Sequence, residues 1–385
     1  MGLKIAYCLP SLYIAGGMER VLTTKANYFA DILGHDIYII LTDGKDRPPF
    51  YKLSPKVKIV NLDVNFNELW TISSFFKKIP FHLKKQRIYK RRLREALFEI
   101  RPDITISMLR REIDFINSIK DGSIKIGETH VVKENLRYVG VGEKESFINR
   151  AATKIWNNLL IGKLRKLSAF VILTNEDREK WTNLKNTTVI HNPLESFPTA
   201  SSDCENKKVI AVGRYVYIKG FDMLIEAWKI VAEKHPDWEL HIYGNGDKEP
   251  LEKQIETLGL KSNCFLDDPV KNIEEKFLES SIHVLSSRCE GFGLVLAEAM
   301  SCGVPPVSFD CPCGPKEIIK HGENGLLVES FDIEKLSENI CYLIENESVR
   351  KEMGKRAKEN AERFRIEKIA GEWERLFREL IDKRG

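Results

Sequence analysis

The chain has 385 residues, of which 43% are apolar and 30% are charged, and it carries a formal net charge of +4. This balance is typical of soluble proteins with buried cores, and it excludes disordered and fibrous architectures. Since domains commonly contain about 150 residues, the length predicts two or three of them.

The chain contains no long apolar segment. No apolar run approaches the roughly 20 residues of a transmembrane helix, and the first residues lack the apolar stretch and cleavage site of a secretory signal. The eight cysteines are therefore expected to be reduced thiols in the cytoplasm. Cys302, Cys311 and Cys313 lie close together. Their spacing matches no common zinc pattern, and we expect neither a bound metal nor another cofactor.

In the first half of the chain, the period of the apolar residues alternates between strand-like and helix-like. This alternation is typical of an α/β fold with parallel strands. Helices are expected at residues 18–33 and 151–167. Strands are expected at residues 3–9, 37–41, 57–62, 104–108, 125–127, 169–173 and 188–190. These elements predict one complete βαβ domain.

A linker is expected at residues 194–207, because this segment is polar and interrupted by proline. The alternation then restarts, with strands expected at residues 209–212, 239–243, 264–266, 282–285, 304–309 and 325–328. Helices are expected at residues 221–234, 250–258, 273–280, 294–302 and 315–320. Residues 332–383 are expected to be helical in about three segments, the last with an apolar face of Ile366, Ile369, Trp373, Phe377 and Leu380. Parallel α/β domains bind ligands at the carboxyl ends of their strands, so we expect a site between the two domains.

Charge is distributed unevenly along the chain. Residues 1–192 contain 33 Lys+Arg and 20 Asp+Glu, a net charge of +13, whereas residues 193–385 have a net charge of −9. The densest basic stretch lies between Glu68 and Glu95 and contains Lys77, Lys78, Lys84, Lys85, Arg87, Lys90, Arg91, Arg92 and Arg94. Its apolar neighbours are Trp70, Phe75, Phe76, Phe81, Ile88 and Tyr89. Such a mixture suits an anionic membrane surface, and no nucleic-acid motif accompanies it. A helix face exposed only to solvent is the alternative interpretation.

The segment from Ser286 to Pro306 follows an expected strand and leads into a helix that begins near Gly293. The N-terminus of a helix presents N–H groups and a positive dipole end, which suits phosphate. A diphosphate there would lie between Glu290, in the loop, and Glu298, more than one turn into the helix. Glu298 could then accept both hydroxyls of a ribose, and Glu290 could bind a sugar beyond the distal phosphate. If the group beyond the distal phosphate were a sugar, this arrangement would hold a nucleotide sugar. Two unrelated surface glutamates are the alternative interpretation.

Three other turns follow expected strands. Arg214 and Lys219 follow the first strand of the second domain, where two fixed cations could meet a leaving diphosphate. Gly16 and Gly17 occupy the equivalent turn of the first domain, where the absence of side chains lets the backbone approach a phosphate. Gly244 also lies at the end of an expected strand. A tight turn beneath the nucleotide explains a glycine at this position as well as direct contact with the nucleotide does.

Together these residues resemble the retaining GT-B glycosyltransferases of family 4, particularly bacterial enzymes that extend surface polysaccharides or lipid-linked oligosaccharides. The resemblance extends over nearly the whole chain and includes residues 16–20, 192–193, 213–220, 290–298, 314–317 and 324–325. It implies a GT-B fold: two Rossmann-like parallel-sheet domains that face a central cleft, with a C-terminal helix that crosses back to the first domain. The expected division is an acceptor-side domain of residues 1–192 with 366–385, and a donor-binding domain of residues 193–365.

The resemblance also implies roles for individual residues. Arg214 and Lys219 would bind the donor diphosphate, Glu298 the ribose, and Glu290 the hydroxyls of the donor sugar. His130 follows an expected strand and matches a histidine that, in this family, lies beside the donor sugar. We therefore expect His130, Arg214, Lys219 and Glu290 to be catalytic. The donor-binding residues are expected to be Gly16, Gly17, Gly244, Gly291, Phe292, Gly293, Leu294, Val295 and Glu298.

The function that this resemblance implies is transfer of a sugar, with retention of configuration, from a nucleotide-diphosphate sugar. The expected donor is a UDP-sugar, and the expected acceptor is a glycan or a lipid-linked glycan at the inner face of the cell membrane. No metal is required, because Arg214 and Lys219 can replace a divalent cation. In the family's front-face route the acceptor hydroxyl attacks from the side on which the diphosphate leaves; Glu290 as a covalent nucleophile is the alternative.

Two other enzyme classes bind related ligands. A nucleotide-sugar epimerase of the same two-domain shape would bind the same donor, but it would leave the basic stretch unexplained. A dinucleotide dehydrogenase fits less well, since neither Gly16-Gly17 nor Gly244-Asn245-Gly246 completes a G-x-G-x-x-G fingerprint.

Overall fold

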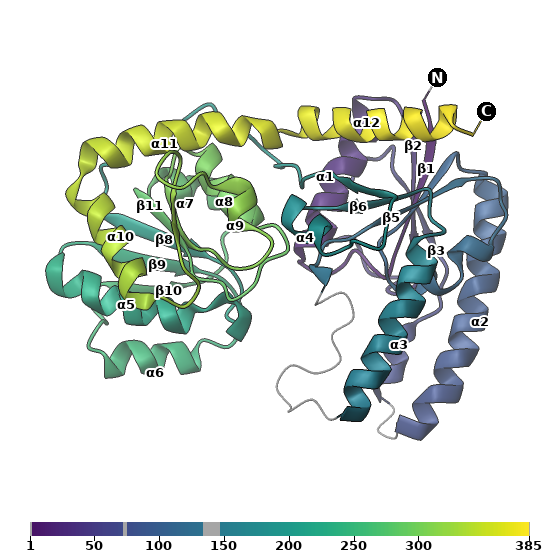
Figure 1. Ribbon diagram of the computed structural model, residues 1–385, viewed down its shortest axis with the longest axis horizontal. Coiled ribbons are helices and arrows are strands. Elements are labelled where there is room, and N and C mark those ends of the chain that lie inside the picture. The colour runs from purple at the N-terminus through teal and green to yellow at the C-terminus, as the bar shows by residue number, and fades with distance from the viewer. Residues whose placement is uncertain (1, 72–74, 134–146, 385) are drawn as a thin grey trace. The chain divides into compact units, whose positions relative to one another are not determined.

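The computed structural model describes residues 2–71, 75–133 and 147–384. The chain divides into two compact units, Met1–Pro193 together with Ile366–Gly385, and Leu194–Arg365. The colour scale of Figure 1 follows the chain through both of them. Within the described ranges, no helix is both long enough and apolar enough to span a bilayer.

The first unit contains a seven-stranded sheet in the order β3-β2-β1-β4-β5-β6-β7, and all of its strand pairs are parallel. Residues of the central strands are almost all buried, as in sheets that are covered on both faces. The strands are β1 (Lys4–Leu9), β2 (Asp36–Leu41), β3 (Lys58–Asn61), β4 (Ile104–Ser107), β5 (Ile124–Glu128), β6 (Ala169–Ile172) and β7 (Thr187–Val189).

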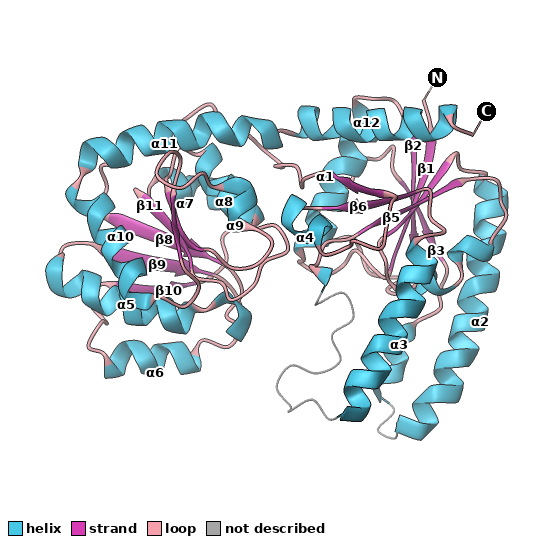
Figure 2. Ribbon diagram, in the orientation of Figure 1, coloured by secondary structure: helices cyan, strands magenta, loops and turns pink. Residues whose placement is uncertain are grey.

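Helices cover this sheet (Figure 2). They are α1 (Gly17–Asp31), α2 (Phe75–Ile100), α3 (Phe147–Leu164), α4 (Asn175–Glu179) and α12 (Ile366–Asp382). The final helix, α12, packs on α1, where the ring of Phe377 meets that of Phe29 edge-on, with 5.9 Å between centroids. Trp373 of α12 is 1% exposed. The apolar face of α12 is therefore covered by the first unit.

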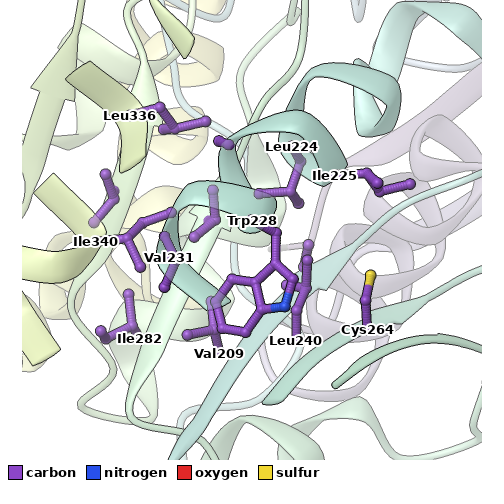
Figure 3. Close-up of a cluster of buried hydrophobic side chains, with 14 of the residues drawn as sticks. Val209, Leu224, Ile225, Trp228, Val231, Leu240, Cys264, Ile282, Leu336 and Ile340 are labelled. Carbon is purple, nitrogen blue, oxygen red and sulfur yellow. The ribbon is translucent and has the colours of Figure 1, made fainter. Parts of the chain in front are cut away.

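The second unit contains a six-stranded parallel sheet in the order β10-β9-β8-β11-β12-β13. Its strands are β8 (Lys208–Val212), β9 (Glu239–Tyr243), β10 (Cys264–Asp267), β11 (Ile282–Leu285), β12 (Pro306–Phe309) and β13 (Leu326–Val328). Its helices are α5 (Phe221–Lys234), α6 (Glu249–Thr257), α7 (Ile273–Leu278), α8 (Leu294–Ser301), α9 (Pro315–Ile318), α10 (Ile333–Glu345) and α11 (Glu347–Ala361). Figure 3 shows the core between sheet and helices, centred on Trp228. The indole nitrogen of Trp228 donates to the carbonyl of Asn263 at 3.0 Å, so this large side chain is buried without an unpaired donor.

These two parallel-sheet α/β units confirm the expected fold class. The expected elements differ from the observed ones only at their ends, but helices α2 and α4 were not among the expected helices. The helix expected at residues 18–33 ends at Asp31, because the chain turns at Gly34, whose φ is +69°. The strand expected at residues 304–309 begins only at Pro306, where pairing with β11 starts.

Helix α2 contains most of the basic stretch, and not all of its basic side chains face solvent. Lys85 donates to the carbonyls of Val64 and Asn65 at 2.6 and 2.9 Å, and Arg92 donates to the carbonyl of Leu62 at 2.6 Å. Tyr89 is buried. The basic residues that do face solvent are Lys84, Arg87, Lys90, Arg91 and Arg94. The side chains of Lys77, Lys78, Trp70, Phe75 and Phe76 lie outside the described part of the structure.

Candidate active site

The loop between β8 and α5 meets the loop between β11 and α8 in the second unit. Lys219 Nζ, from the first loop, lies 2.7 Å from Oε1 of Glu290, from the second. Ser287 Oγ donates to the same carboxylate oxygen at 2.6 Å. The side chains of Lys219 and Glu290 are only 21% and 11% exposed. The two loops therefore hold a cation and an anion together near the carboxyl ends of two neighbouring strands.

Gly220 allows the close approach of these loops. Its φ of +65° lies in the left-handed region that favours glycine. A Cβ at this position would overlap the carbonyl oxygen of Ser286. The hydroxyl of Ser286, in turn, donates to the carbonyl of Lys219 at 3.1 Å. The backbone of Lys219 is thus fixed against the end of β11.

Arg288 joins the same two loops, although it is not among the residues expected from the sequence. Its guanidinium lies 3.8 Å from the centre of the Tyr217 ring and donates to the Tyr217 carbonyl at 2.7 Å. It also donates to both carboxylate oxygens of Asp222, at 2.8 and 2.6 Å. Partial burial opposes ionisation of Asp222, but the charge of Arg288 outweighs burial and lowers the pKa of the carboxyl group. In the sequence, the position of Arg288 directly after Ser286-Ser287, at the end of an expected strand, could have indicated that it belongs to this site.

The N-terminus of α8 follows the Glu290 loop. Gly293 precedes the helix with a φ of +83°. The ring of Phe292 is buried and meets Phe364 edge-on, with 5.4 Å between centroids. The first N–H groups of a helix have no acceptor within it, and they can bind phosphate. The other residues expected at this site are all partly exposed: Gly291, Leu294, Val295 and Glu298.

Arg214 and Gly244 differ from each other in exposure and packing. Arg214 is exposed on the same loop as Lys219. Gly244 lies against the backbone of Gly213, whose carbonyl oxygen a Cβ would overlap. Close packing therefore accounts for a glycine at position 244.

Gly16, Gly17 and His130 belong to the first unit. Gly16 precedes α1 and Gly17 is its first residue. His130 follows β5, and its Nε2 lies 2.9 Å from Oε1 of Glu128. Glu128 is buried and also forms an ion pair with Lys25 of α1. Neither Glu128 nor Lys25 is among the residues expected from the sequence.

The first unit also contains a cavity of about 440 Å³ beside the carboxyl ends of β2 and β3. The loop of residues 44–49 forms one of its walls, and Leu12, Leu41, Ile59 and Asn61 complete the lining. The cavity therefore combines apolar side chains with the charged side chains of Lys45, Asp46 and Arg47.

Among the residues that the structure describes, no group of three or more His, Cys, Asp or Glu side chains could hold a metal ion. The thiols of Cys302, Cys311 and Cys313 are buried. Burial raises the pKa of Cys302 to about 12, so this thiol is protonated at neutral pH.

Residues 195–360 match the protein family described as Glycosyl transferases group 1. This segment is similar to glycosyltransferase group 1 domains. It lies within the second unit, so the Lys219–Glu290 pair and the start of α8 belong to it.

Relatives of known class match over nearly the full length. An uncharacterized glycosyltransferase of Haemophilus influenzae is 29% identical over 384 residues, which are 97% of this chain and 99% of that protein. The GalNAc-α-(1→4)-GalNAc-α-(1→3)-diNAcBac-PP-undecaprenol α-1,4-N-acetyl-D-galactosaminyltransferase of Campylobacter jejuni is 28% identical, covering 98% of this chain and 99% of that protein. These matches support a glycosyltransferase, and they give no support to an epimerase.

Two solved structures show the same fold. Sucrose-phosphate synthase of Thermosynechococcus elongatus superposes with a TM-score of 0.79 at 16% identity, covering 99% of this chain and 100% of that one. The HepE protein of Anabaena in complex with UDP superposes with a TM-score of 0.74 at 18% identity, covering 98% of this chain and 100% of that one.

Proposed function

We propose that the protein is a retaining glycosyltransferase that transfers a sugar from a UDP-sugar to a glycan or lipid-linked acceptor in the synthesis of a bacterial surface polysaccharide. The main support is the Lys219–Glu290 pair, 2.7 Å apart, beside the N-terminus of α8. UDP as the nucleotide is supported by the Anabaena structure of the same fold. A lipid-linked acceptor is supported by the name of the Campylobacter relative.

The donor diphosphate would be bound by cations and by helix N–H groups. Lys219 and the exposed Arg214 lie on one loop, and both can donate to phosphate oxygens while negative charge develops on the leaving group. The start of α8 adds N–H groups and the positive end of its dipole. With the diphosphate neutralised in this way, the transfer requires no metal ion. Glu298, on the second turn of α8, would bind the ribose.

Glu290 would bind hydroxyls of the donor sugar rather than attack its anomeric carbon. Lys219 and Ser287 both bind its Oε1. A carboxylate whose oxygen is already occupied by an ammonium and a hydroxyl is a weak nucleophile. This geometry favours the front-face route, in which the acceptor hydroxyl attacks beside the departing phosphate, and a phosphate oxygen takes its proton.

The two units would have separate roles. The second unit contains the Lys219–Glu290 pair and would hold the donor. The first unit would hold the acceptor, with the cavity beside β2 and β3 as one candidate position. Its helix α2 would bind anionic lipid at the inner face of the cell membrane, because Lys84, Arg87 and Arg91 face solvent together with the apolar Phe81 and Leu83.

The proposal is tested by one pair of variants. Lys219→Met removes the phosphate cation, and it should lower turnover about 100-fold because an electrostatic contribution to the transition state is lost. Lys248→Met is the matched control. Lys248 also lies in the second unit, is 24% exposed and pairs with an acid, Asp268, at 2.7 Å. This control should retain turnover within about threefold.

Binding of UDP, GDP, CDP and ADP, measured by calorimetry, should identify UDP as the preferred nucleotide. NMR of the product should show that the anomeric configuration of the donor is kept. An inverted product, or equal turnover of the Lys219 and Lys248 variants, would contradict the proposed reaction.

A further inference from the structure

The short 3₁₀ turn that ends with Lys219 is bound at each of its three carbonyls by the loop that follows β11. Arg288 Nη1 donates to the carbonyl of Tyr217 at 2.7 Å, and the backbone N–H of Arg288 donates to the carbonyl of Ile218 at 2.8 Å. Ser286 Oγ donates to the carbonyl of Lys219 at 3.1 Å. Two of these three hydrogen bonds therefore come from Arg288.

The guanidinium of Arg288 also joins the turn to the start of α5. Its two terminal nitrogens donate to the two carboxylate oxygens of Asp222, at 2.8 and 2.6 Å, and Asp222 is the second residue of α5. A planar, bidentate pair of this kind fixes direction as well as distance. The guanidinium carbon lies 3.8 Å from the centre of the Tyr217 ring. Arg288 thus connects the loop after β11, the 3₁₀ turn and the first turn of α5.

Arg288 and Lys219 differ in what their charged groups bind. Both terminal nitrogens of Arg288 are bound to the turn and to Asp222, and the side chain is 15% exposed. The Lys219 ammonium instead lies 2.7 Å from Oε1 of Glu290, in the loop before α8. To bind a phosphate, Arg288 would have to give up its bidentate partner. Its contacts therefore suit it to hold the turn rather than to bind a ligand.

We infer that Arg288 is a positioning residue that fixes the place of the Lys219 ammonium in the donor site. It acts through the backbone, because it holds the two residues before Lys219 against the loop that contains Glu290. This inference rests on the proposed function, in which Lys219 binds the donor diphosphate. A shift of about 1 Å in a group that acts on the reaction can lower its rate about 100-fold, so the loss of this attachment should lower turnover.

A double-mutant cycle tests whether Arg288 acts through Lys219. Arg288→Lys keeps the positive charge and loses the bidentate fork, and turnover should fall about tenfold or more. In the Lys219→Met protein the same substitution should change turnover less than about threefold, because the ammonium that Arg288 positions is already absent. A direct contact between Arg288 and phosphate, or a general loss of stability, would instead lower turnover by the same factor in both proteins.

Asp222→Ala provides a second test, because it leaves Arg288 in place. An arginine released from its carboxylate would be freer to bind phosphate, whereas a positioning residue would lose its attachment to α5. Turnover should therefore fall about fivefold or more in Asp222→Ala. Unchanged or increased turnover in this variant would contradict the inference.

Arg350→Lys is the matched control. Arg350, in α11 of the same unit, is 3% exposed, donates to three backbone carbonyls and lies 5.2 Å from the centre of the Trp238 ring. These partners lie outside the two loops of the candidate site. Arg350→Lys should lower the melting temperature and leave turnover within about twofold. If turnover followed the melting temperature across the Arg288, Asp222 and Arg350 variants, the role of Arg288 would be structural and the inference would be wrong.

Hydrogen exchange gives a readout that needs no substrate. The amides of Lys219 and Gly220 are hydrogen-bonded within the turn, at 2.9 and 3.2 Å. Their exchange should be faster in Arg288→Lys than in the wild type, and unchanged in Arg350→Lys. Unchanged exchange in Arg288→Lys would overturn the inference even if the wild type transferred sugar. Absence of sugar transfer by the wild type, with the exchange as expected, would instead overturn the proposed function.

Discussion

At the scale of single residues, Gly220 determines how closely the two loops of the candidate site approach. Its φ is +65°, and a Cβ would overlap the carbonyl oxygen of Ser286. Gly220→Ala should therefore weaken UDP binding about tenfold or more, because Ser286 and the backbone of Lys219 must move apart. Gly259→Ala is the control, since Gly259 has a similar φ of +71° and nothing near its Cβ position. Both changes involve a left-handed backbone penalty of roughly 1–2 kcal/mol, and calorimetry should show weaker binding only for the first.

A buried histidine makes the stability of the second unit dependent on pH. His283 of β11 is fully buried, with Nδ1 3.0 Å from the carbonyl of Ile210. Burial lowers its pKa from 6.5 to about 4, and the nearby Lys219 contributes in the same direction. The unfolded chain therefore binds a proton between pH 6.5 and 4 that the folded chain excludes, so stability falls as the pH falls through this range. The free energy of unfolding falls by about 3 kcal/mol over this pH range.

His283→Leu should remove that part of the pH dependence. Denaturant unfolding at pH 6.5 and at pH 4.5 measures this pH dependence. The control is His235→Leu, at a partly exposed position of the same unit where the imidazole pairs with Glu345. The wild type and the His235 variant should lose stability equally between the two pH values, and the His283 variant should lose less. An equal loss in all three proteins would exclude His283 as the cause.

The residues of the candidate site could be predicted from the sequence only in part. The positions of Lys219 and Glu290 after expected strands indicated a diphosphate and a sugar site, but not that the two side chains pair directly. That pairing depends on the separation of β8 and β11 in space, and neighbouring strands cannot be assigned from local patterns. Lys25 did leave a signal, because it occurs four residues after Val21 and four before Phe29, on the buried face of α1.

At the scale of elements, α12 is attached through a buried apolar face in which Trp373 is the largest side chain. Trp373 is 1% exposed, and its ring contacts both Lys25 and Phe377. Trp373→Ala should lower the free energy of unfolding by about 3–5 kcal/mol, through lost burial and the cavity that remains. Arg375→Ala, at an exposed position of the same helix, should change it by less than about 0.5 kcal/mol. Similar unfolding midpoints for the two variants would show that α12 contributes little to the first unit.

The elements themselves followed from the sequence, because parallel strands that are buried on both faces are short apolar runs and the helices between them have a period near 3.6. Helix α2 is the main exception. Its core residues Tyr89, Leu93, Leu97 and Ile100 have helical spacing. The many basic residues among them obscured this pattern, and only the structure separates the buried Tyr89 from the exposed face.

At the scale of the whole molecule, residues 1–192 have a net charge of +13. Part of this charge is concentrated on the exposed surface of α2. Lys84, Arg87, Lys90 and Arg91 are exposed, and the exposed apolar side chains Ile79, Phe81 and Leu83 precede or accompany them. Each basic residue near an anionic membrane contributes about 1 kcal/mol, and the apolar side chains can enter the interface. The wild type should therefore co-sediment with anionic liposomes at low salt.

Replacing these four residues by Gln should lower binding to anionic liposomes about 1,000-fold, since about 4 kcal/mol of attraction is lost. The control replaces Lys45, Lys52, Lys56 and Lys58 by Gln. These lysines are exposed in the same unit, and their replacement changes the net charge by the same amount. Binding of the control should fall only slightly, and that of the wild type should fall steeply once the Debye length is about 8 Å. Equal losses of liposome binding in the two variants would mean that overall charge, rather than α2, attracts the membrane. Unchanged binding by the α2 variant would mean that this helix face is exposed only to solvent and does not bind the membrane.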